Sequence, residues 1–328
     1  MKKVSLVLAA LLGLTLLALA PAKTFITIGS GGYTGTYYPV AVGIAKIINS
    51  NMRDVRANAI STGGSLFNVI AIETDDQQLA MAQNDTSYYA FTGMVIAKVI
   101  GKPTKRLRGI AAIYPEMLHV IVRTDSGIKS LADLRGRRVY VGDIGSGTEQ
   151  NAKLVLKSYG LDFSDLGVVE HGKAGAAVQM ILDNKIDAMF FVAAVGSSAF
   201  EQVAAKGNVT FLSIDQDHLN KLERDYPFYS QVVVPAGTYP NQKKDFTSVA
   251  VSALLVTSSD MPADLIYHIA KLLFIQKVSE FKSIKPVVAQ YFDIHNALKG
   301  MSIPLHKGAA KLYHDLKIAI PAKAAPID

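Results

Sequence analysis

The sequence predicts an α/β protein with two lobes. Apolar runs of strand length alternate with helical patterns from one end of the chain to the other, which is typical of parallel α/β architecture. Glycine-rich turns join several of these runs to the helix that follows. The chain has 328 residues, more than one hydrophobic core usually holds, so we expect two lobes.

Residues 1–22 are predicted to be a signal peptide rather than part of the fold. Two lysines precede an apolar run over 4–20, and Ala20-Pro21-Ala22 has the small residues of a cleavage site. A proline directly after the cut is poorly tolerated, so we expect cleavage after Ala22 rather than after Ala20. The alternative is an uncleaved anchor, because the run approaches the roughly 20 residues of a spanning helix. Its short length and alanine-rich end favour cleavage and export to the periplasm.

The composition limits the classes of function. The chain has no cysteine, so its fold depends on its core rather than on disulfides, and a lipid-anchored N-terminus is excluded. The formal charge of +7 favours acidic small molecules as partners. Basic residues gather only at 105–108 and 135–138, and we interpret both groups as solvated surface. No nucleic acid is therefore expected as a partner.

The predicted elements alternate between strand and helix. In the N-terminal third, strands are predicted at 25–28, 55–60 and 79–82, each followed by a helix, at 39–49, 65–73 and from about 85. Two strands at 110–113 and 118–122 then leave this unit. The second unit comprises a helix start at Ser130–Asp133, strand 138–141, helix 148–159, strand 168–169, helix 176–183, strands 188–192 and 209–214, and a return strand at 231–234.

A discontinuous first lobe gives the simplest assembly of these elements. We predict lobe I over 23–113 plus 236–328 and lobe II over 114–235, with two crossover segments forming a hinge above an interlobe cleft. The C-terminal part of lobe I is predicted to begin with a strand at 249–256. A long helix capped by Asp260 and opened near Pro262 would follow it.

Two glycine-rich turns, Gly29–Pro39 and Gly142–Glu149, are the strongest candidates for a binding site. Each lies between a predicted strand and a predicted helix, where free backbone N–H groups and the helix dipole favour an anion. Glycine lets a ligand approach the backbone closely, and the Ser and Thr hydroxyls add donors. One turn falls in each lobe, so the pair could hold the two ends of a dicarboxylate. The alternative is that these glycines serve only tight turns.

Two further turns, Ser61–Asn68 and Gln83–Tyr88, also follow predicted strands. In an open parallel sheet, ligands bind beyond the carboxyl ends of the strands, where all four turns should lie. Ser65 and Asn68 share one face of their helix. For Asp85, a role as a helix N-cap is an equal alternative to ligand contact.

No motif in the sequence indicates a catalytic, metal or cofactor site. Ser146 lacks the G-x-S-x-G surroundings of a nucleophile elbow, and Thr34 stands where a dinucleotide fingerprint needs its last glycine. No spacing typical of a metal site relates the histidines, and His119, His171 and His268 are interpreted as structural or exposed. We therefore expect no catalytic residue, no metal and no cofactor.

Six segments of the sequence carry a resemblance to a known family. They are Gly32–Pro39, Ser61–Ser65, Gln83–Asp85, Gly145–Glu149, Ala236–Pro240 and Gly300–His306. Together and in this order they resemble the TAXI family of solute receptors, which serve tripartite ATP-independent periplasmic (TRAP) transporters. The resemblance implies a type II periplasmic-binding-protein fold that closes around its ligand. It also implies membrane subunits that import the solute with a sodium or proton gradient, and an acidic ligand such as glutamate or a 2-oxoacid.

The resemblance and the chemistry of the turns together give a set of expected ligand contacts. No arginine lies in the four turns, so backbone and hydroxyl donors would have to bind the anion. Tyr38 has a core position as its alternative. The expected contacts are Thr34, Gly35, Tyr37, Tyr38, Ser61, Thr62, Gly64, Ser65, Ser146, Gly147 and Thr148, to which the turns add Asn84, Asp85 and Glu149.

An α-amino group on the ligand would need a carboxylate partner, because a desolvated ammonium without one is costly. Asp85, Glu116, Asp143 and Glu149 are the candidates. If one of them faces the cleft, glutamate or glutamine is the expected ligand. If none does, a 2-oxoacid such as 2-oxoglutarate fits better.

The function predicted from the sequence is that of an extracytoplasmic solute receptor. It would act as a monomer that binds a small acidic solute and delivers it to the TRAP membrane subunits. Two alternatives stay open: a binding protein of the same fold that feeds a sensor, and a secreted enzyme.

Overall fold

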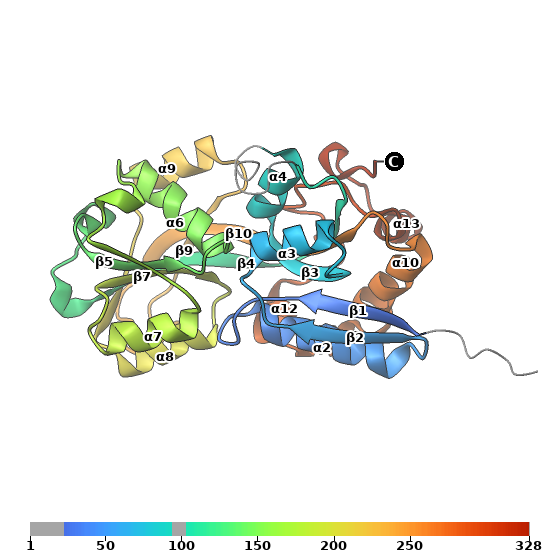
Figure 1. Cartoon of the computed structure of the whole chain (residues 1–328), viewed down its shortest axis with the longest axis horizontal. Coiled ribbons are helices and arrows are strands. Elements are labelled where there is room, and N and C mark those ends of the chain that lie inside the picture. The colour runs from blue at the N-terminus through green and yellow to red at the C-terminus, as the bar shows by residue number, and fades with distance from the viewer. Residues whose placement is uncertain (1–22, 94–102, 328) are drawn as a thin grey trace, which may run out of the picture.

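A computed structural model describes residues 23–93 and 103–327 of the chain, so the predicted signal peptide lies outside the described residues. The chain forms two α/β lobes that lie side by side, with two long strands passing from one to the other (Figure 1). This confirms the predicted fold class. In the part of the chain that the structure describes, no helix is long and apolar enough to cross a membrane.

Lobe I is built on five strands in the order β2-β1-β3-β10-β4. Strands β1, β2 and β3 are parallel, and β10 is antiparallel to β3 and to β4. The elements are β1 (Thr24–Gly29), α2 (Tyr37–Asn51), β2 (Val55–Ile60), α3 (Ser65–Glu73), β3 (Leu79–Gln83), α4 (Asn84–Thr92), β4 (Leu107–Arg123), β10 (Phe246–Ser258), α10 (Ala263–Lys271), a π-helical turn (Leu272–Gln276), α11 (Val278–Ser283), α12 (Pro286–Tyr291), α13 (Lys307–Asp315) and a 3₁₀ turn (Ala322–Ala324).

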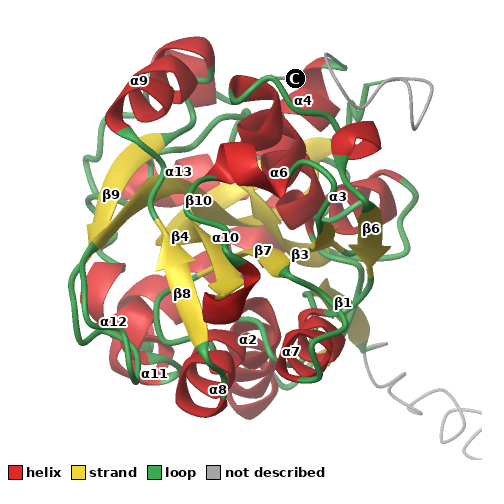
Figure 2. Cartoon of the chain, turned by 90° about the vertical axis from the view of Figure 1, so that its left-hand side faces the viewer, coloured by secondary structure: helices red, strands yellow, loops and turns green. Residues whose placement is uncertain are grey.

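Lobe II repeats this order of strands as β6-β5-β7-β4-β8, with β9 paired to β10. Helices cover both faces of its sheet, α6 and α9 on one and α7 and α8 on the other (Figure 2). The elements are 3₁₀ turns at Thr124–Ser126, Leu131–Leu134 and Phe163–Asp165, β5 (Arg138–Gly142), α6 (Gly147–Ser158), β6 (Val168–His171), α7 (Ala174–Leu182), β7 (Ala188–Ala193), α8 (Ser198–Lys206), β8 (Val209–Leu212), α9 (Gln216–Asp225) and β9 (Ser230–Val234).

In each lobe the sheet begins with three parallel strands in the order second, first, third along the chain. A strand that also enters the other lobe pairs with the third, and the fourth strand of the lobe lies beyond it. The shared strand is β10 in lobe I and β4 in lobe II. This arrangement is the type II periplasmic-binding-protein fold that the resemblance implied. The carboxyl ends of the parallel strands of both lobes face the space between the lobes, as expected for an open α/β sheet.

The two crossovers differ from the prediction. Residues 110–113 and 118–122 are not separate strands, because β4 continues through Pro115. Proline has no N–H, and the opposite residue, Ser252, donates its own N–H to Asn84 Oδ1 at 3.1 Å. The side chain of Asn84 thus completes the pairing at the point where proline would have ended it.

The return crossing lies within β10, later than the predicted lobe boundary at residue 236. Residues 246–250 pair with β9, and Val249 and Val251 belong to the core of lobe II. From Ala253 onward, the side chains of β10 belong to the core of lobe I. Both hinge segments are therefore parts of continuous strands rather than loops.

Other differences concern helix ends and short helices. Asp260 does not cap the C-terminal helix, since α10 begins after Pro262 and Asp260 pairs instead with Arg106 at 2.8 Å. Ser130 and Asp133 do form the expected capping box, but it starts only a 3₁₀ turn. Helices α8 and α9 were not predicted.

Lobe II holds a buried histidine whose neutral state is defined by its contacts. His119 Nδ1 lies 3.0 Å from the carbonyl oxygen of Met117, which can only accept, so Nδ1 donates and Nε2 accepts from the Tyr239 hydroxyl at 2.9 Å. The imidazole stacks on Phe200 with ring centroids 3.7 Å apart. Burial lowers the pKa of His119 to about 3.

We expect His119→Gln to make the protein less sensitive to acid. Between pH 6.5 and about 3 the unfolded chain binds a proton at this site and the folded chain does not, so wild-type stability falls as pH falls through this window. The slope from this residue is up to about 1.4 kcal/mol per pH unit. Urea denaturation at pH 7 and pH 5 should therefore show a smaller loss of unfolding free energy in the variant than in the wild type. His268→Gln, at an exposed position, controls for removal of an imidazole, and an equal loss in wild type and His119→Gln would contradict the prediction.

Candidate functional site

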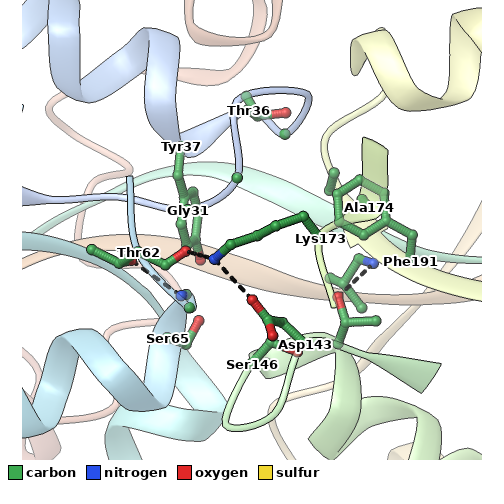
Figure 3. Close-up of a pocket in the computed structure, with 18 of the residues that line it drawn as sticks. Gly31, Thr36, Tyr37, Thr62, Ser65, Asp143, Ser146, Lys173, Ala174 and Phe191 are labelled. Carbon is green, nitrogen blue, oxygen red and sulfur yellow. Dashed lines mark hydrogen bonds and ion pairs between the residues drawn. The ribbon is translucent and has the colours of Figure 1, made fainter. Parts of the chain in front are cut away.

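A cavity lies between the two lobes, where the carboxyl ends of the strands of both lobes meet. Together with its open mouth it encloses about 570 Å³, within the usual size of a small-molecule site. Its walls come from the turns before four helices, two in each lobe (Figure 3). The lining residues are Gly31, Gly32, Gly35, Thr36, Tyr37, Thr62, Gly63, Gly64, Ser65, Gln83, Glu116, Tyr140, Asp143, Ser146, Gly147, Thr148, Gly172, Lys173, Ala174, Phe191, Val192 and Ala193.

Four helix N-termini meet at this cavity. Lobe I provides the starts of α2 at Tyr37 and of α3 at Ser65, and lobe II those of α6 at Gly147 and of α7 at Ala174. The first N–H groups of a helix have no partner within the helix, and each N-terminus carries about half a positive charge. Their convergence makes the cavity suitable for an anion.

Lys173 adds a full positive charge to the cavity wall and crosses between the lobes. It lies at the N-cap of α7, and its Nζ donates to the carbonyl oxygen of Thr62 in lobe I at 2.5 Å (Figure 3). The same Nζ pairs with Asp143 Oδ2 at 2.8 Å. Half of the Lys173 side chain is exposed, so the amine sits where an entering solute can reach it.

The hydroxyl groups that were expected to bind ligand have structural partners. Ser146 caps α6 by accepting from Glu149 N–H, and Thr148 accepts from Val192 N–H, both at 3.1 Å. Ser65 accepts from Gln83 N–H at 3.1 Å. Thr62 donates to the carbonyl oxygen of Ser30 at 2.7 Å. These side chains hold the turns in shape around the cavity.

Direct hydrogen bonds join the lobes around the cavity. Asn151 of lobe II donates to Gln83 Oε1 and Asp85 Oδ2 of lobe I, each at 3.0 Å. Leu66 N–H donates to the carbonyl oxygen of Gly145 at 3.1 Å. Gly147 leaves no room for a side chain, since a Cβ there would lie 2.0 Å from Gln83 Oε1. The structure is therefore that of a closed form.

Thr34 takes part in this closed interface rather than in the cavity wall. Its carbonyl oxygen accepts from the hydroxyls of Ser197 and Ser198, both at 3.0 Å, and from Ala199 N–H at 3.3 Å. These three donors form the N-terminus of α8. The turn before α2 therefore docks on lobe II at the start of an unpredicted helix.

The structure brings eight of the fourteen expected contacts to the cavity. Gly35, Tyr37, Thr62, Gly64, Ser65, Ser146, Gly147 and Thr148 line it. Six do not line it: Thr34, Tyr38, Ser61, Asn84, Asp85 and Glu149.

The residues outside the lining have other contacts. Tyr38 packs edge to face against Tyr33, with ring centroids 4.6 Å apart. The Ser61 hydroxyl donates to Gly31 O at 2.9 Å, within its own lobe. Asp85 is not an N-cap, because Gln83 holds that position on α4. Burial raises the pKa of Asp85 to about 6.

Two ionisable residues of the cavity, Tyr37 and Glu116, form a buried hydrogen-bonded pair. Tyr37 donates its phenolic hydrogen to Glu116 Oε2 at 2.6 Å, and only 2% of Glu116 is exposed. Burial, and to a lesser degree the nearby charge of Asp85, raises the pKa of Glu116 to about 8, although the Tyr37 hydrogen bond opposes the shift. Glu116 lies on β4 next to Pro115, at the point where the chain crosses between the lobes.

Lys173 is the functional residue that the sequence reasoning missed. The signal was present, because Gly172-Lys173-Ala174-Gly175 follows strand 168–171 and precedes a helix, like the four turns that were singled out. Phe191 of β7 was also missed and lines the cavity with an aromatic ring. Among residues 23–93 and 103–327, no group of three or more His, Asp or Glu could hold a metal ion.

We expect Gly147→Ala to force the lobes apart. The added methyl group would displace Gln83, which is buried and accepts from Asn151, so the interlobe hydrogen bond would be lost. Small-angle X-ray scattering should give a larger radius of gyration for this variant than for the wild type. Gly31→Ala is the control, because its Cβ would meet only Tyr37 of the same lobe, at 3.7 Å. Identical scattering from all three proteins would contradict the prediction.

Three solved structures are similar to this chain at low sequence identity. A protein of Bordetella bronchiseptica RB50 is 16% identical, with a TM-score of 0.51 over 92% of this chain and 91% of that one. A structure from work on glutathione import via GshT and the cystine ABC importer TcyBC of Streptococcus mutans is 14% identical. Its TM-score is 0.49 over 81% of this chain and 95% of that one. The periplasmic aliphatic sulphonate binding protein SsuA of Escherichia coli is 14% identical, with a TM-score of 0.44 over 92% and 90%.

The sequence itself matches a family. The NMT1-like family matches residues 28–315, a range that begins in β1, ends with α13 and includes every turn around the cavity. Because this match extends over most of the chain and both lobes, the protein belongs to the NMT1-like family.

Proposed function

We propose that this protein is an extracytoplasmic solute receptor that binds a small acidic solute between its lobes. The observation that carries the proposal is the convergence of four helix N-termini and Lys173 on one interlobe cavity. Each N-terminus favours a negative group by about 0.3–1 kcal/mol, and more where the geometry is partly buried. A solute with one or two carboxylates matches this wall.

The solute would also complete the closed form. The cavity walls come from both lobes, so a solute held by α2 or α3 on one side and by α6 or α7 on the other stabilises the closed arrangement. Lys173 contributes to this role from lobe II, because its amine already reaches Thr62 in lobe I.

We further propose that the receptor works in the periplasm as a monomer and delivers its solute to TRAP membrane subunits. This part of the proposal rests on the predicted signal peptide and on the TAXI-like segments. Four of these six segments contribute residues to the cavity lining: Gly32–Pro39, Ser61–Ser65, Gln83–Asp85 and Gly145–Glu149. Delivery is tested by solute uptake into vesicles that hold the TRAP membrane subunits, with and without the purified receptor.

We expect acidic metabolites to raise the melting temperature of the purified chain. A ligand that binds only the folded state stabilises it by RT ln(1 + [L]/Kd), about 2.7 kcal/mol at one hundred times Kd. A panel of mono- and dicarboxylates, with amino and 2-oxo members, gives the measurement by thermal shift. The absence of a shift with every acid would overturn the proposed function.

Lys173→Met should weaken binding of the acid that gives the largest shift by about ten- to a hundredfold. This range corresponds to the loss of one hydrogen bond to a charged group, about 1.5–3 kcal/mol. Lys153→Met, at an exposed position on α6 outside the cavity lining, is the matched control. Equal affinities in the two variants would show that Lys173 does not bind the anion.

A further inference from the structure

Four carboxylates lie in or beside the cleft, and each has at least one partner. Asp143 pairs with Lys173. Asp85 accepts from Thr86 N–H at 2.6 Å on one oxygen and from Asn151 on the other, and it does not line the cavity. Glu149 accepts from Gly145 N–H at 2.8 Å inside its own turn, also outside the lining.

Glu116 differs from Asp143, the other lining carboxylate, because it is buried and has no cationic partner among the described residues. Its Oε2 accepts from Tyr37, and no hydrogen bond or ion pair to its Oε1 is formed by the part of the chain that the structure describes. Glu116 lines the cavity although only 2% of the residue is exposed. The free oxygen therefore belongs to a side chain held in the wall of the binding site.

The surroundings of Glu116 supply no countercharge. Tyr37 of α2 and Tyr114 of β4 lie close to it, and Asp85 of α4 adds a like charge. Among residues 23–93 and 103–327, no lysine, arginine or histidine forms an ion pair with it. A buried carboxylate without a partner is costly to ionise, so a cationic group brought by the solute would relieve this cost.

A second residue of the cavity lining, Thr36, also has a polar atom without a hydrogen-bond partner in the described part of the chain. Thr36 is one of the lining residues and is buried, and its Oγ1 has no hydrogen-bond partner among the described residues. A hydroxyl group can donate or accept, so it suits a polar group of either kind on the solute. The Glu116 carboxylate and the Thr36 hydroxyl thus each belong to a lining residue and each keep unused hydrogen-bonding capacity.

We propose that Glu116 is a specificity-determining residue whose free oxygen pairs with an amino group of the solute, so that the receptor selects amino acids over the matching 2-oxoacids. The proposal rests on the proposed receptor function and names the solute class for that site. The carboxylate of the solute would face the helix N-termini and Lys173, and its ammonium would face Glu116. The wall is then complementary to a zwitterion rather than to a simple anion.

The test compares L-glutamate with 2-oxoglutarate, and L-alanine with pyruvate, by titration calorimetry on the purified protein. Within each pair only the amino group is exchanged for an oxo group. We expect the wild type to prefer the amino acid at least tenfold and Glu116→Gln to lose this preference. Asp143→Asn is the matched control, because it neutralises a lining carboxylate that already has a partner. Its amino-to-oxo preference should equal that of the wild type, whatever its affinity.

A second measurement uses the wild type alone and does not depend on how the variant folds. The pKa of Glu116 is raised to about 8, so the residue is mostly protonated at pH 7, and pairing with an ammonium requires it to ionise. Binding of the amino acid should therefore release close to one proton at pH 7, seen as a heat that depends on the buffer. Its affinity should rise as pH is raised from 6 to 8, by up to tenfold per unit.

Preference for the 2-oxoacid in the wild type, or an unchanged amino-to-oxo ratio in folded Glu116→Gln, would overturn this inference while leaving the acidic-solute receptor intact. Amino acid binding without proton release would overturn it as well. If neither member of either pair binds and the wider acid panel gives no thermal shift, the proposed function itself fails and the inference fails with it.

Discussion

The antiparallel pairing of β4 with β10 is the constraint on which the rest of the structure depends. In lobe I the pairing begins with Leu107 opposite Ser258, and at the start of lobe II it ends with Met117 opposite Ala250. One ladder of backbone hydrogen bonds therefore belongs to both lobes. Because each lobe adds its parallel strands to this ladder, the carboxyl ends of both sets of strands face one gap. The helices that follow those strands must then begin at that gap. The convergence of four N-termini is thus a consequence of strand order.

The same constraint explains why buried carboxylates accumulate here. Glu116 lies on β4 at the crossing itself, and Asp85 lies in the first turn of α4, which packs on the neighbouring strand β10. Burial raises the pKa of both groups, and the charge of Asp85 raises the pKa of Glu116 further. In most of the fold such a pair would only reduce stability. In the proposed site, Glu116 would ionise when it pairs with an ammonium group, and this would discriminate between solutes that share a carboxylate.

Much of the fold was predictable from the sequence, because local signals and tertiary structure agree. Helix Ser65–Glu73 and strand Val55–Ile60 have the predicted ends, set by glycine-rich turns and apolar periodicity. The predicted end of the strand near Pro115 was wrong. The group that compensates for proline, the Asn84 side chain, lies 31 residues earlier in the sequence, where no local pattern could reveal it. In the site, the sequence located the turns but could not show which structural hydrogen bonds their side chains also make. The hydroxyls of Ser146 and Thr148 are used by neighbouring backbone, and no local pattern shows that. Whether the turns bind a solute stays a prediction.

The free energy of closure follows from how few contacts join the lobes directly. The hydrogen bonds of Asn151, Leu66 and the Thr34 carbonyl group each contribute about 0.5–1.5 kcal/mol, and opening lets water replace them. The hinge costs little either way, because both crossing strands stay continuous and need only bend. The six interlobe hydrogen bonds of Asn151, Leu66 and the Thr34 carbonyl group together contribute about 3–9 kcal/mol to the closed form. In the proposed function, a solute that pairs with both lobes adds a binding free energy of comparable size and shifts the population toward the closed form.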